Sequence, residues 1–130
     1  MGKRHLVGSN TLIDFLSGRL PPDGKRLMFD LIDQDEVNIS VITEIEVLGF
    51  QAPEEYLQKV QRLVDEANVI PLAEPAIVQK AIEIRRHSRL KLPDAVIAAT
   101  ALTRQLTLIT RNEKDFSRVE DLKILNPHSL

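Results

Sequence analysis

Short apolar runs alternate along the chain with longer stretches in which apolar residues recur every three or four positions. The short runs predict β-strands, and the three- and four-residue spacing predicts amphipathic helices. The predicted strands cover residues 4–7, 37–41, 68–72, 106–110 and 122–125. The predicted helices cover residues 11–16, 25–33, 43–48, 53–67, 74–88 and 93–104, with at most a short one over 113–118.

Strands therefore alternate with helices over the whole length, which predicts an α/β fold. We expect a three-layer α/β/α sandwich whose central parallel sheet has four to five short strands. Pro71 near the end of the third predicted strand indicates that this strand lies at or near a sheet edge. The chain of 130 residues is long enough to bury one core, and no linker or repeat divides it. We expect residues 1–130 to form a single domain.

Composition excludes several kinds of site. The chain has no Cys, which excludes disulfides, thiolate zinc sites and cysteine nucleophiles. No apolar run approaches the roughly 18 residues of a membrane span, and the N-terminus lacks the apolar core of a signal peptide. We therefore expect a cytoplasmic protein without a membrane partner. The formal net charge of −2 means that nucleic-acid binding would need a local basic patch or bridging cations.

The stretch from Leu92 to Leu102 is an almost wholly apolar helix signal with one acid, Asp94, near its start. A helix that is apolar on nearly all sides is expected to be buried. Pro93 fits the first helical position and places Asp94 in the first turn. Taken alone, such an acid is explained by its favourable interaction with the helix dipole. A further role depends on which other acids lie near it.

Acidic and polar residues gather where predicted strands end and the next helices begin. Ligands of parallel sheets bind beyond the carboxyl ends of the strands, so Glu46, Asp94 and Asp115 are expected on one rim. Carboxylate oxygens suit Mg²⁺ or Mn²⁺, and such an ion can activate water for attack on a phosphoryl group. Solvated rim acids, which are common in α/β folds, are the alternative interpretation.

Three segments carry this chemistry: residues 40–47, 92–101 and 108–116. Together they resemble the motifs of PIN-domain nucleases, most closely the VapC-type toxins of bacterial toxin–antitoxin pairs. The likeness runs essentially end to end. It implies that Glu46, Asp94 and Asp115 are ligands of a Mg²⁺ or Mn²⁺ cofactor, and that Glu44 is only a neighbour of the site.

The same resemblance implies supporting groups, a reaction and partners. Thr110 and Asn112 are expected to be polar groups of the catalytic site, with Phe116 packed beneath them. The implied activity is that of a metal-dependent endoribonuclease, the toxin of a type II toxin–antitoxin system, hydrolysing RNA phosphodiesters. The implied partners are a cognate antitoxin and a second copy of the chain, as a homodimer or, with the antitoxin, a heterotetramer or larger assembly.

One position departs from the family pattern. Members usually carry Asp at the end of the first strand, where this chain has Gly8 within Leu6-Val7-Gly8-Ser9-Asn10. Glycine supplies neither charge nor a side-chain oxygen, so we expect weak metal binding and little or no hydrolysis. Gly8 is interpreted as an inactivating change, engineered or selected because an active ribonuclease poisons its host, or as the mark of a natural pseudoenzyme.

Basic residues are the candidates for RNA binding. Arg89 and Lys91 precede Asp94 and can guide a phosphate backbone towards the metal, although they equally suit a solvated helix end. Arg111, beside Asn112, is the better single candidate for a phosphate contact. Asp14 is interpreted as a solvated acid on the first helix.

An apolar surplus between residues 15 and 32 is expected to be mainly core. The resemblance implies that part of it forms the groove in which the C-terminal segment of an antitoxin docks. Two other functions remain open at this point. One is a catalytically silent PIN-like module that binds RNA or protein, and the other is a metal-dependent phosphatase on a related sheet.

Overall fold

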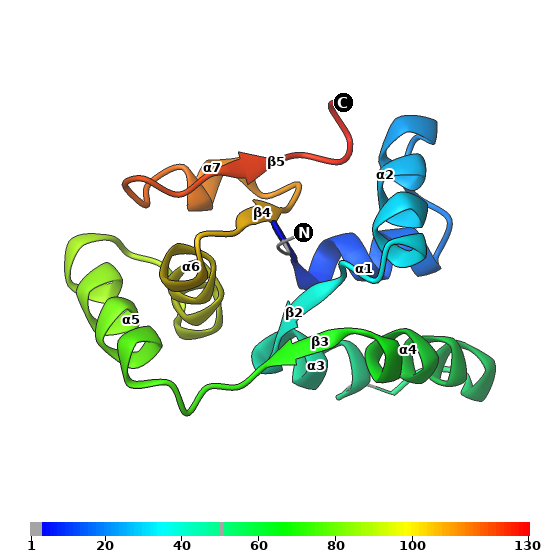
Figure 1. Ribbon diagram of the computed structural model, residues 1–130, viewed down its shortest axis with the longest axis horizontal. Helices are drawn as coiled ribbons and strands as arrows, with labels where there is room; N and C mark the ends of the chain where they lie inside the picture. Colours follow the sequence, from blue (N-terminus) through cyan, green and yellow to red (C-terminus); the bar gives the residue numbers. More distant parts are fainter. Residues whose placement is uncertain (1–3, 50) are drawn as a thin grey trace.

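A five-stranded parallel sheet forms the centre of the computed structural model, which describes residues 4–49 and 51–130 (Figure 1). Its order is β3-β2-β1-β4-β5, and every neighbouring pair is parallel. The strands are β1 His5–Val7, β2 Asn38–Ser40, β3 Asn68–Ile70, β4 Thr107–Ile109 and β5 Ile124–Leu125. The predicted α/β class and strand number are confirmed, and β3, which precedes Pro71, is an edge strand as expected.

Helices connect the strands and cover both faces of the sheet (Figure 1). They are α1 Ser9–Leu16, α2 Pro22–Asp33, α3 Val41–Leu48, α4 Glu54–Glu66, α5 Pro75–His87, α6 Leu92–Arg104 and α7 Glu113–Phe116. Helices α1 and α3 begin earlier than predicted, because they follow β1 and β2 without a loop. Gly8 occupies the N-cap position of α1, and the Ser40 hydroxyl caps α3 by accepting the Ile42 N–H at 3.1 Å.

Successive residues of a strand point to opposite faces of the sheet, and each face packs into its own hydrophobic core. Leu6 and Leu108 pack with α5 and α6 on one face, whereas Val7 and Ile109 pack with the cluster formed by α1 to α4 on the other. Helix α6 is buried throughout its middle, in agreement with its apolar sequence. The sheet is thus enclosed on both sides, and its polar groups are exposed at the strand ends.

The order in which strands are added to the sheet changes side at β1. From β1 it proceeds through β2 to the edge at β3, and it returns to place β4 on the other side of β1. Gly8 N–H donates to the Ile109 carbonyl at 2.9 Å, which joins the carboxyl ends of β1 and β4. Such a switch point leaves a crevice beyond the strand ends, and ligand sites of open α/β sheets form there.

The C-terminal segment returns from β5 to the second helix. Pro127 is buried, and its carbonyl oxygen occupies the place that a Cβ on Gly24 of α2 would need. Gly24 is therefore required by this close approach, although the sequence marks it only as part of a Pro- and Gly-containing stretch. Within residues 4–49 and 51–130, no helix has the length and apolarity needed to cross a membrane.

Candidate functional site

A small pocket of about 80 Å³ lies at the switch point, beyond the carboxyl ends of β1 and β4. It brings together five residues singled out from the sequence and the position of the missing acid. Its lining residues are Gly8, Ser9, Asn10, Glu46, Asp94, Ile97, Leu108, Thr110, Asn112 and Phe116. Asp115 is not among them, but its carboxylate lies close enough to act on Asp94 electrostatically.

Asp94 is the half-buried acid of the pocket. It lies in the first turn of α6, which begins at Leu92, so that Pro93 is the second helical residue and not the first as predicted. Burial raises the pKa of Asp94, the Glu46 and Asp115 carboxylates raise it further, and Lys91 opposes them. Three acids from distant parts of the sequence therefore repel one another at one place, as expected for a group whose charge a cation would neutralise.

Glu46 is held by a hydroxyl group from the opposite wall. Ser9 Oγ donates a hydrogen bond of 2.6 Å to Glu46 Oε1 and lies 3.1 Å from Thr43 Oγ1. Ser9 lies in the first turn of α1, and Thr43 and Glu46 are one turn apart on α3. No sequence motif marks this contact, because only the packing of α1 against α3 brings the Ser9 hydroxyl to the acid.

Asp115 is oriented by the loop that follows β4. Asn112 Nδ2 donates to Asp115 Oδ2 at 3.1 Å, and Asn112 Oδ1 accepts the Asp115 N–H at 3.3 Å. Thr110 Oγ1 in turn accepts the Asn112 N–H at 3.0 Å. Buried Phe116 lines the pocket from the end of α7. The expected supporting positions of Thr110 and Asn112 thus have a direct geometric basis.

The acids match Mg²⁺ or Mn²⁺ in chemical type but not in arrangement. Carboxylate oxygens are the ligands that these hard cations prefer. Yet among residues 4–49 and 51–130, no group of three or more His, Cys, Asp or Glu side chains is arranged to hold a metal ion. In this part of the chain, the three acids would have to move closer together to share one ion, and position 8 contributes no carboxylate.

Gly8 is buried and has an ordinary extended backbone, with φ −74° and ψ 161°. This conformation is open to every L-amino acid, so glycine is not required for backbone reasons. A Cβ at position 8 would lie 3.0 Å from the Ile109 carbonyl oxygen and 3.7 Å from Thr110 Cβ. A Cβ at this place in the pocket wall therefore requires the Ile109 carbonyl, which accepts the Gly8 N–H, to move by a few tenths of an ångström.

The basic candidates differ in their surroundings. Arg89 and Lys91 are exposed, and Lys91 is near enough to Asp94 to lower its pKa. The Arg111 side chain is 48% exposed but pairs with Asp14 at 3.0 Å. The interpretation of Asp14 as a solvated acid is wrong, since its side chain is only 1% exposed. Its position among the apolar residues of α1 was the available signal, because an inward-facing acid requires a partner.

Comparison with known proteins agrees with this geometry. The family model described as PIN domain matches residues 6–122. The chain belongs to the PIN-domain family. This PIN domain is similar to a chain of a toxin–antitoxin complex from Klebsiella pneumoniae, with 30% identity, a TM-score of 0.72, and coverage of 97% of this chain and 99% of that one. Among curated proteins, a sequence search gives no significant match.

Two further solved structures share the fold. A chain of DNA-bound VapBC from Salmonella typhimurium has 23% identity and a TM-score of 0.83, with 97% of this chain and 99% of that chain covered. A chain of VapBC2 from Rickettsia felis bound to a promoter DNA fragment has 21% identity and a TM-score of 0.79, with 94% and 97% covered. The complete PIN architecture, and not only its motifs, is therefore present.

Proposed function

We propose that this PIN domain is the toxin of a toxin–antitoxin pair and an endoribonuclease that depends on Mg²⁺ or Mn²⁺. The observation that carries the proposal is the pocket at the switch point, where burial, the pocket residue Glu46 and nearby Asp115 all raise the pKa of Asp94. Family membership supports a hydrolytic nuclease, and the similarity to a chain of a toxin–antitoxin complex supports the biological role.

Each residue has a distinct part in the proposed reaction. Glu46, Asp94 and Asp115 would hold the metal, which supplies an activated water and a counter-charge for the phosphoryl oxygens. Ser9 orients the Glu46 carboxylate, and Asn112 orients that of Asp115. Hydrolysis adds water across one P–O bond of RNA, so that the leaving sugar oxygen gains a proton. Exposed Arg89 and Lys91 are positioned before Asp94 to attract the phosphate backbone.

Gly8 limits this reaction in the present chain, because one metal ligand of the family is missing. The test compares this chain with Gly8→Asp on a mixed RNA pool, with Mg²⁺, with Mn²⁺ and with chelator. We expect cleavage mainly by Gly8→Asp, abolished by chelator and by a second change, Asp94→Asn. No metal-dependent cleavage and no growth arrest with Gly8→Asp would contradict the proposed nuclease.

Gly8 also favours a second candidate, a catalytically silent module that binds RNA or a protein. RNA binding by both forms without cleavage by either would support this alternative. The same assay separates the phosphatase interpretation, which predicts that Gly8→Asp turns over a small phosphate ester faster than RNA.

The antitoxin is proposed to contact α2. Phe29 is 51% exposed and meets Phe15 edge-on at 5.2 Å between ring centroids. With Leu20, Lys25 and Arg26 it borders an open apolar depression, which suits an amphipathic partner segment with acidic flanks. Co-purification with the product of an adjacent small gene, lost in Phe29→Glu and kept in Asp30→Asn, is the expected result.

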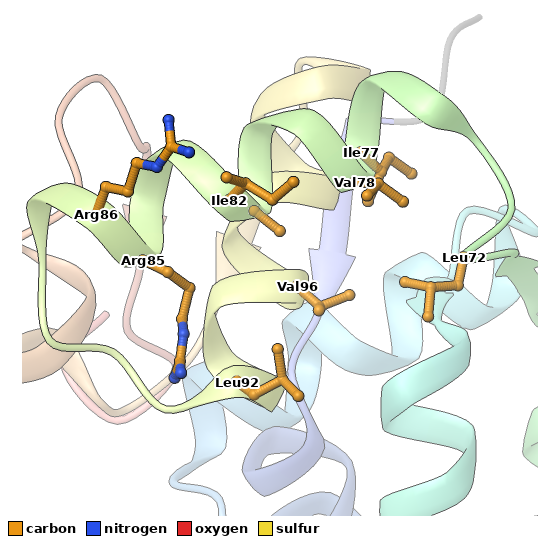
Figure 2. A pocket seen from close by; sticks show the side chains of 9 residues that line it. Leu72, Ile77, Val78, Ile82, Arg85, Arg86, Leu92 and Val96 are labelled. Carbon is orange, nitrogen blue, oxygen red and sulfur yellow. The ribbon is translucent and has the colours of Figure 1, made fainter.

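A homodimer is proposed through an apolar groove of about 540 Å³ between α5 and the start of α6 (Figure 2). Val78 and Ile82 are exposed one turn apart on α5, and Leu92 lies across the groove from them. Figure 2 also shows Arg85 and Arg86 at the C-terminal end of α5. Two copies of α5 crossing antiparallel would cover the apolar stripe of each helix.

Light scattering after gel filtration tests this homodimer. Ile82→Glu is expected to give a monomer, whereas Gln79→Glu, which adds the same charge on the same helix outside the groove, should remain dimeric. Addition of the antitoxin to the dimer would then give a heterotetramer or a larger assembly. A monomeric parent chain at micromolar concentration would refute the proposed interface.

A further inference from the structure

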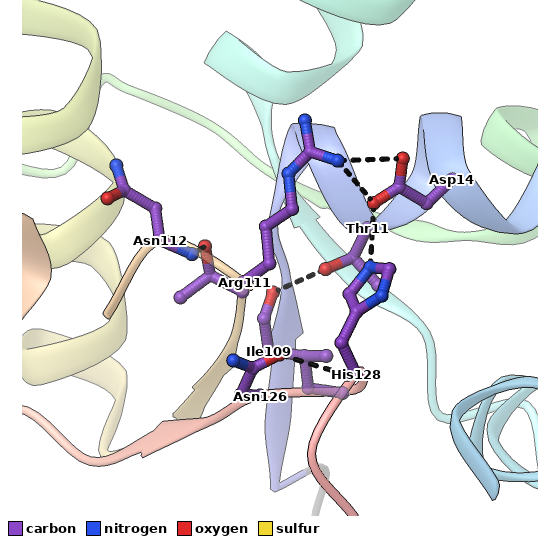
Figure 3. A network of polar contacts seen from close by, with 8 residues as sticks. Thr11, Asp14, Ile109, Arg111, Asn112, Asn126 and His128 are labelled. Carbon is purple, nitrogen blue, oxygen red and sulfur yellow. Dashed lines mark hydrogen bonds and ion pairs between the residues drawn. The ribbon is translucent and has the colours of Figure 1, made fainter. Parts of the chain in front are cut away.

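Asp14 is a buried charge with no part in the acidic pocket. Arg111 Nη1 donates to both carboxylate oxygens of Asp14, at 3.2 and 3.0 Å (Figure 3). His128 Nε2 lies 3.0 Å from Asp14 Oδ2. The three residues come from α1, from the loop between β4 and α7, and from the C-terminal segment. A carboxylate with 1% exposure needs such partners. This need does not explain why the partners are Arg111 and His128, or why the pair lies beside the pocket.

The ion pair connects the two walls of the pocket. Arg111 lies between Thr110 and Asn112, which both line it. Asp14 lies one helical turn beyond Asn10, which lines it from the other side. A parallel link is made by Thr11, whose Oγ1 donates to the Ile109 carbonyl at 3.1 Å. The Arg111 guanidinium is therefore held by α1, on the other side of the pocket from its own backbone.

Arg111 keeps a large free surface in spite of this pairing. Its side chain is 48% exposed, and one nitrogen makes both hydrogen bonds to Asp14. Within residues 4–49 and 51–130, Asp14 is the one hydrogen-bonding partner of its guanidinium. Its other N–H groups form no hydrogen bond with these described residues and are available to an anion. A guanidinium oriented by one carboxylate can still bind a phosphate through its other nitrogens.

His128 also contacts the Asp14 carboxylate, and the segment that carries His128 is itself held in place. The segment that carries His128 is held by the Asn126 side chain, which accepts the His128 N–H at 2.9 Å and donates to Glu113 Oε2 at 2.8 Å. Pro127 packs against Gly24 on α2. Neither Asp14 nor His128 can turn away without disturbing these contacts, so Arg111 has a preorganised partner.

We propose that Asp14, supported by His128, is a positioning residue that holds Arg111 at the rim of the pocket to bind a phosphate of the RNA backbone. The proposal rests on the proposed ribonuclease function, because it names how that same site captures its substrate. It predicts that the loss of Asp14 weakens RNA binding through Arg111, and not through the acidic pocket.

The test measures the affinity of a fluorescein-labelled single-stranded RNA of about ten nucleotides by anisotropy at several salt concentrations. The variants are Arg111→Ala, Arg111→Lys, Asp14→Asn and the double variant of Asp14→Asn with Arg111→Ala. Arg62→Ala, an exposed arginine on α4, is the matched control. Melting temperatures are measured for every protein, so that a loss of folding is separated from a loss of binding.

We expect Arg111→Ala to weaken RNA binding about 5- to 20-fold and to reduce the salt slope by about one, as for one lost phosphate contact. Arg111→Lys should recover part of this affinity. Asp14→Asn should weaken binding about 3- to 10-fold, and it should have little further effect in the Arg111→Ala background. Arg62→Ala should leave the affinity and the slope nearly unchanged.

The proposal would be overturned if Arg111→Ala lowers the melting temperature but leaves the RNA affinity and the salt slope unchanged. The ion pair would then serve only to stabilise the fold. Independent, additive effects of Asp14→Asn and Arg111→Ala would also overturn the proposal. RNA cleavage by Gly8→Asp is measured in parallel. The proposed role of Arg111 can then be refuted while the proposed nuclease activity is supported. If the parent chain does not bind RNA and Gly8→Asp does not cleave it, both proposals fail together.

Discussion

The Ser9 hydroxyl and the Glu46 carboxylate meet across the pocket in a hydrogen bond of 2.6 Å. Ser9 is the residue directly after the position of the missing acid, so the start of α1 still contributes one polar group to the site. A charge-assisted bond of this length restricts Glu46 to one orientation. The site therefore retains an organised wall even where its first acid is absent.

Ser9→Ala is predicted to release Glu46 and to lower catalysis more than stability. In the Gly8→Asp background we expect the RNA cleavage rate to fall about tenfold and the Mg²⁺ concentration for half-maximal rate to rise, since an orienting partner of a metal ligand is lost. The free energy of unfolding should fall by about 1 kcal/mol or less. Ser9→Thr should retain most of the rate. An unchanged Mg²⁺ dependence in Ser9→Ala would argue against this role.

Asp94→Asn is predicted to stabilise the metal-free chain at neutral pH. Because burial and two neighbouring carboxylates raise the pKa of Asp94 in the folded state, the folded chain holds a proton at a pH where the unfolded chain has lost it. Wild-type stability therefore decreases as pH rises through the interval above the ordinary value of 3.8. An asparagine at this position cannot ionise, so the variant does not lose stability in this way as pH rises. Its melting temperature at pH 7 should exceed that of the parent chain by about 1–4 °C.

Calorimetry in chelator from pH 3 to pH 7 measures this difference. The advantage of Asp94→Asn should shrink towards the acid end, where Asp94 is protonated in both states. Asp30→Asn, which changes an exposed acid on α2, should show no such pH dependence. A constant advantage at every pH would show that the repulsion among Asp94, Glu46 and Asp115 is not its source.

Metal binding should report directly on position 8. Mg²⁺ at 10 mM is expected to raise the melting temperature of Gly8→Asp by several degrees and that of the parent chain by clearly less, because the parent has one carboxylate fewer. In chelator, Gly8→Asp should melt below the parent chain, since a further negative charge joins the acids. Equal Mg²⁺ shifts in the two proteins, measured by thermal scanning, would mean that position 8 does not contact the metal.

Gly24→Ala is predicted to destabilise the fold through the C-terminal segment. The added methyl group meets the Pro127 carbonyl oxygen, so α2 and the segment must move apart, at a cost of about 1–3 kcal/mol. Urea unfolding gives the value. Removal of residues 127–130 eliminates the obstacle, so Gly24→Ala should cost much less in the shortened chain. A similar cost in both backgrounds would place the effect elsewhere on α2.

The sequence predicted the features that depend on local patterns and on short motifs. Strand and helix order follows from periodicity, and the expectation of Glu46, Asp94 and Asp115 on one rim follows from the geometry of parallel sheets. Glu46 and Asp94 line one pocket, and Asp115 lies outside its lining. Helix α6 was identified as buried because nearly all its residues are apolar. Its starting residue was off by one, as boundaries depend on single hydrogen bonds.

Contacts between distant segments could not be predicted in the same way. The pairing of Asp14 with Arg111 and His128 joins residues 97 and 114 positions apart, and no local pattern encodes it. The Ser9 contact depends on how α1 packs on α3, and the Gly24 contact depends on the path of the chain after β5. Each requires the assembled fold, in which partners are selected by three-dimensional proximity.

The pairing of β1 with β4 has a consequence for biosynthesis. Thr11 and Ile109 are 98 positions apart, yet their hydrogen bond joins the two segments whose neighbouring residues Asn10 and Thr110 line the pocket. At about 10 residues per second, a ribosome needs roughly 10 s to make the second wall after the first. The nascent chain cannot assemble the acidic pocket during that time. The pocket can therefore be assembled only after the segment through Phe116 has been synthesised.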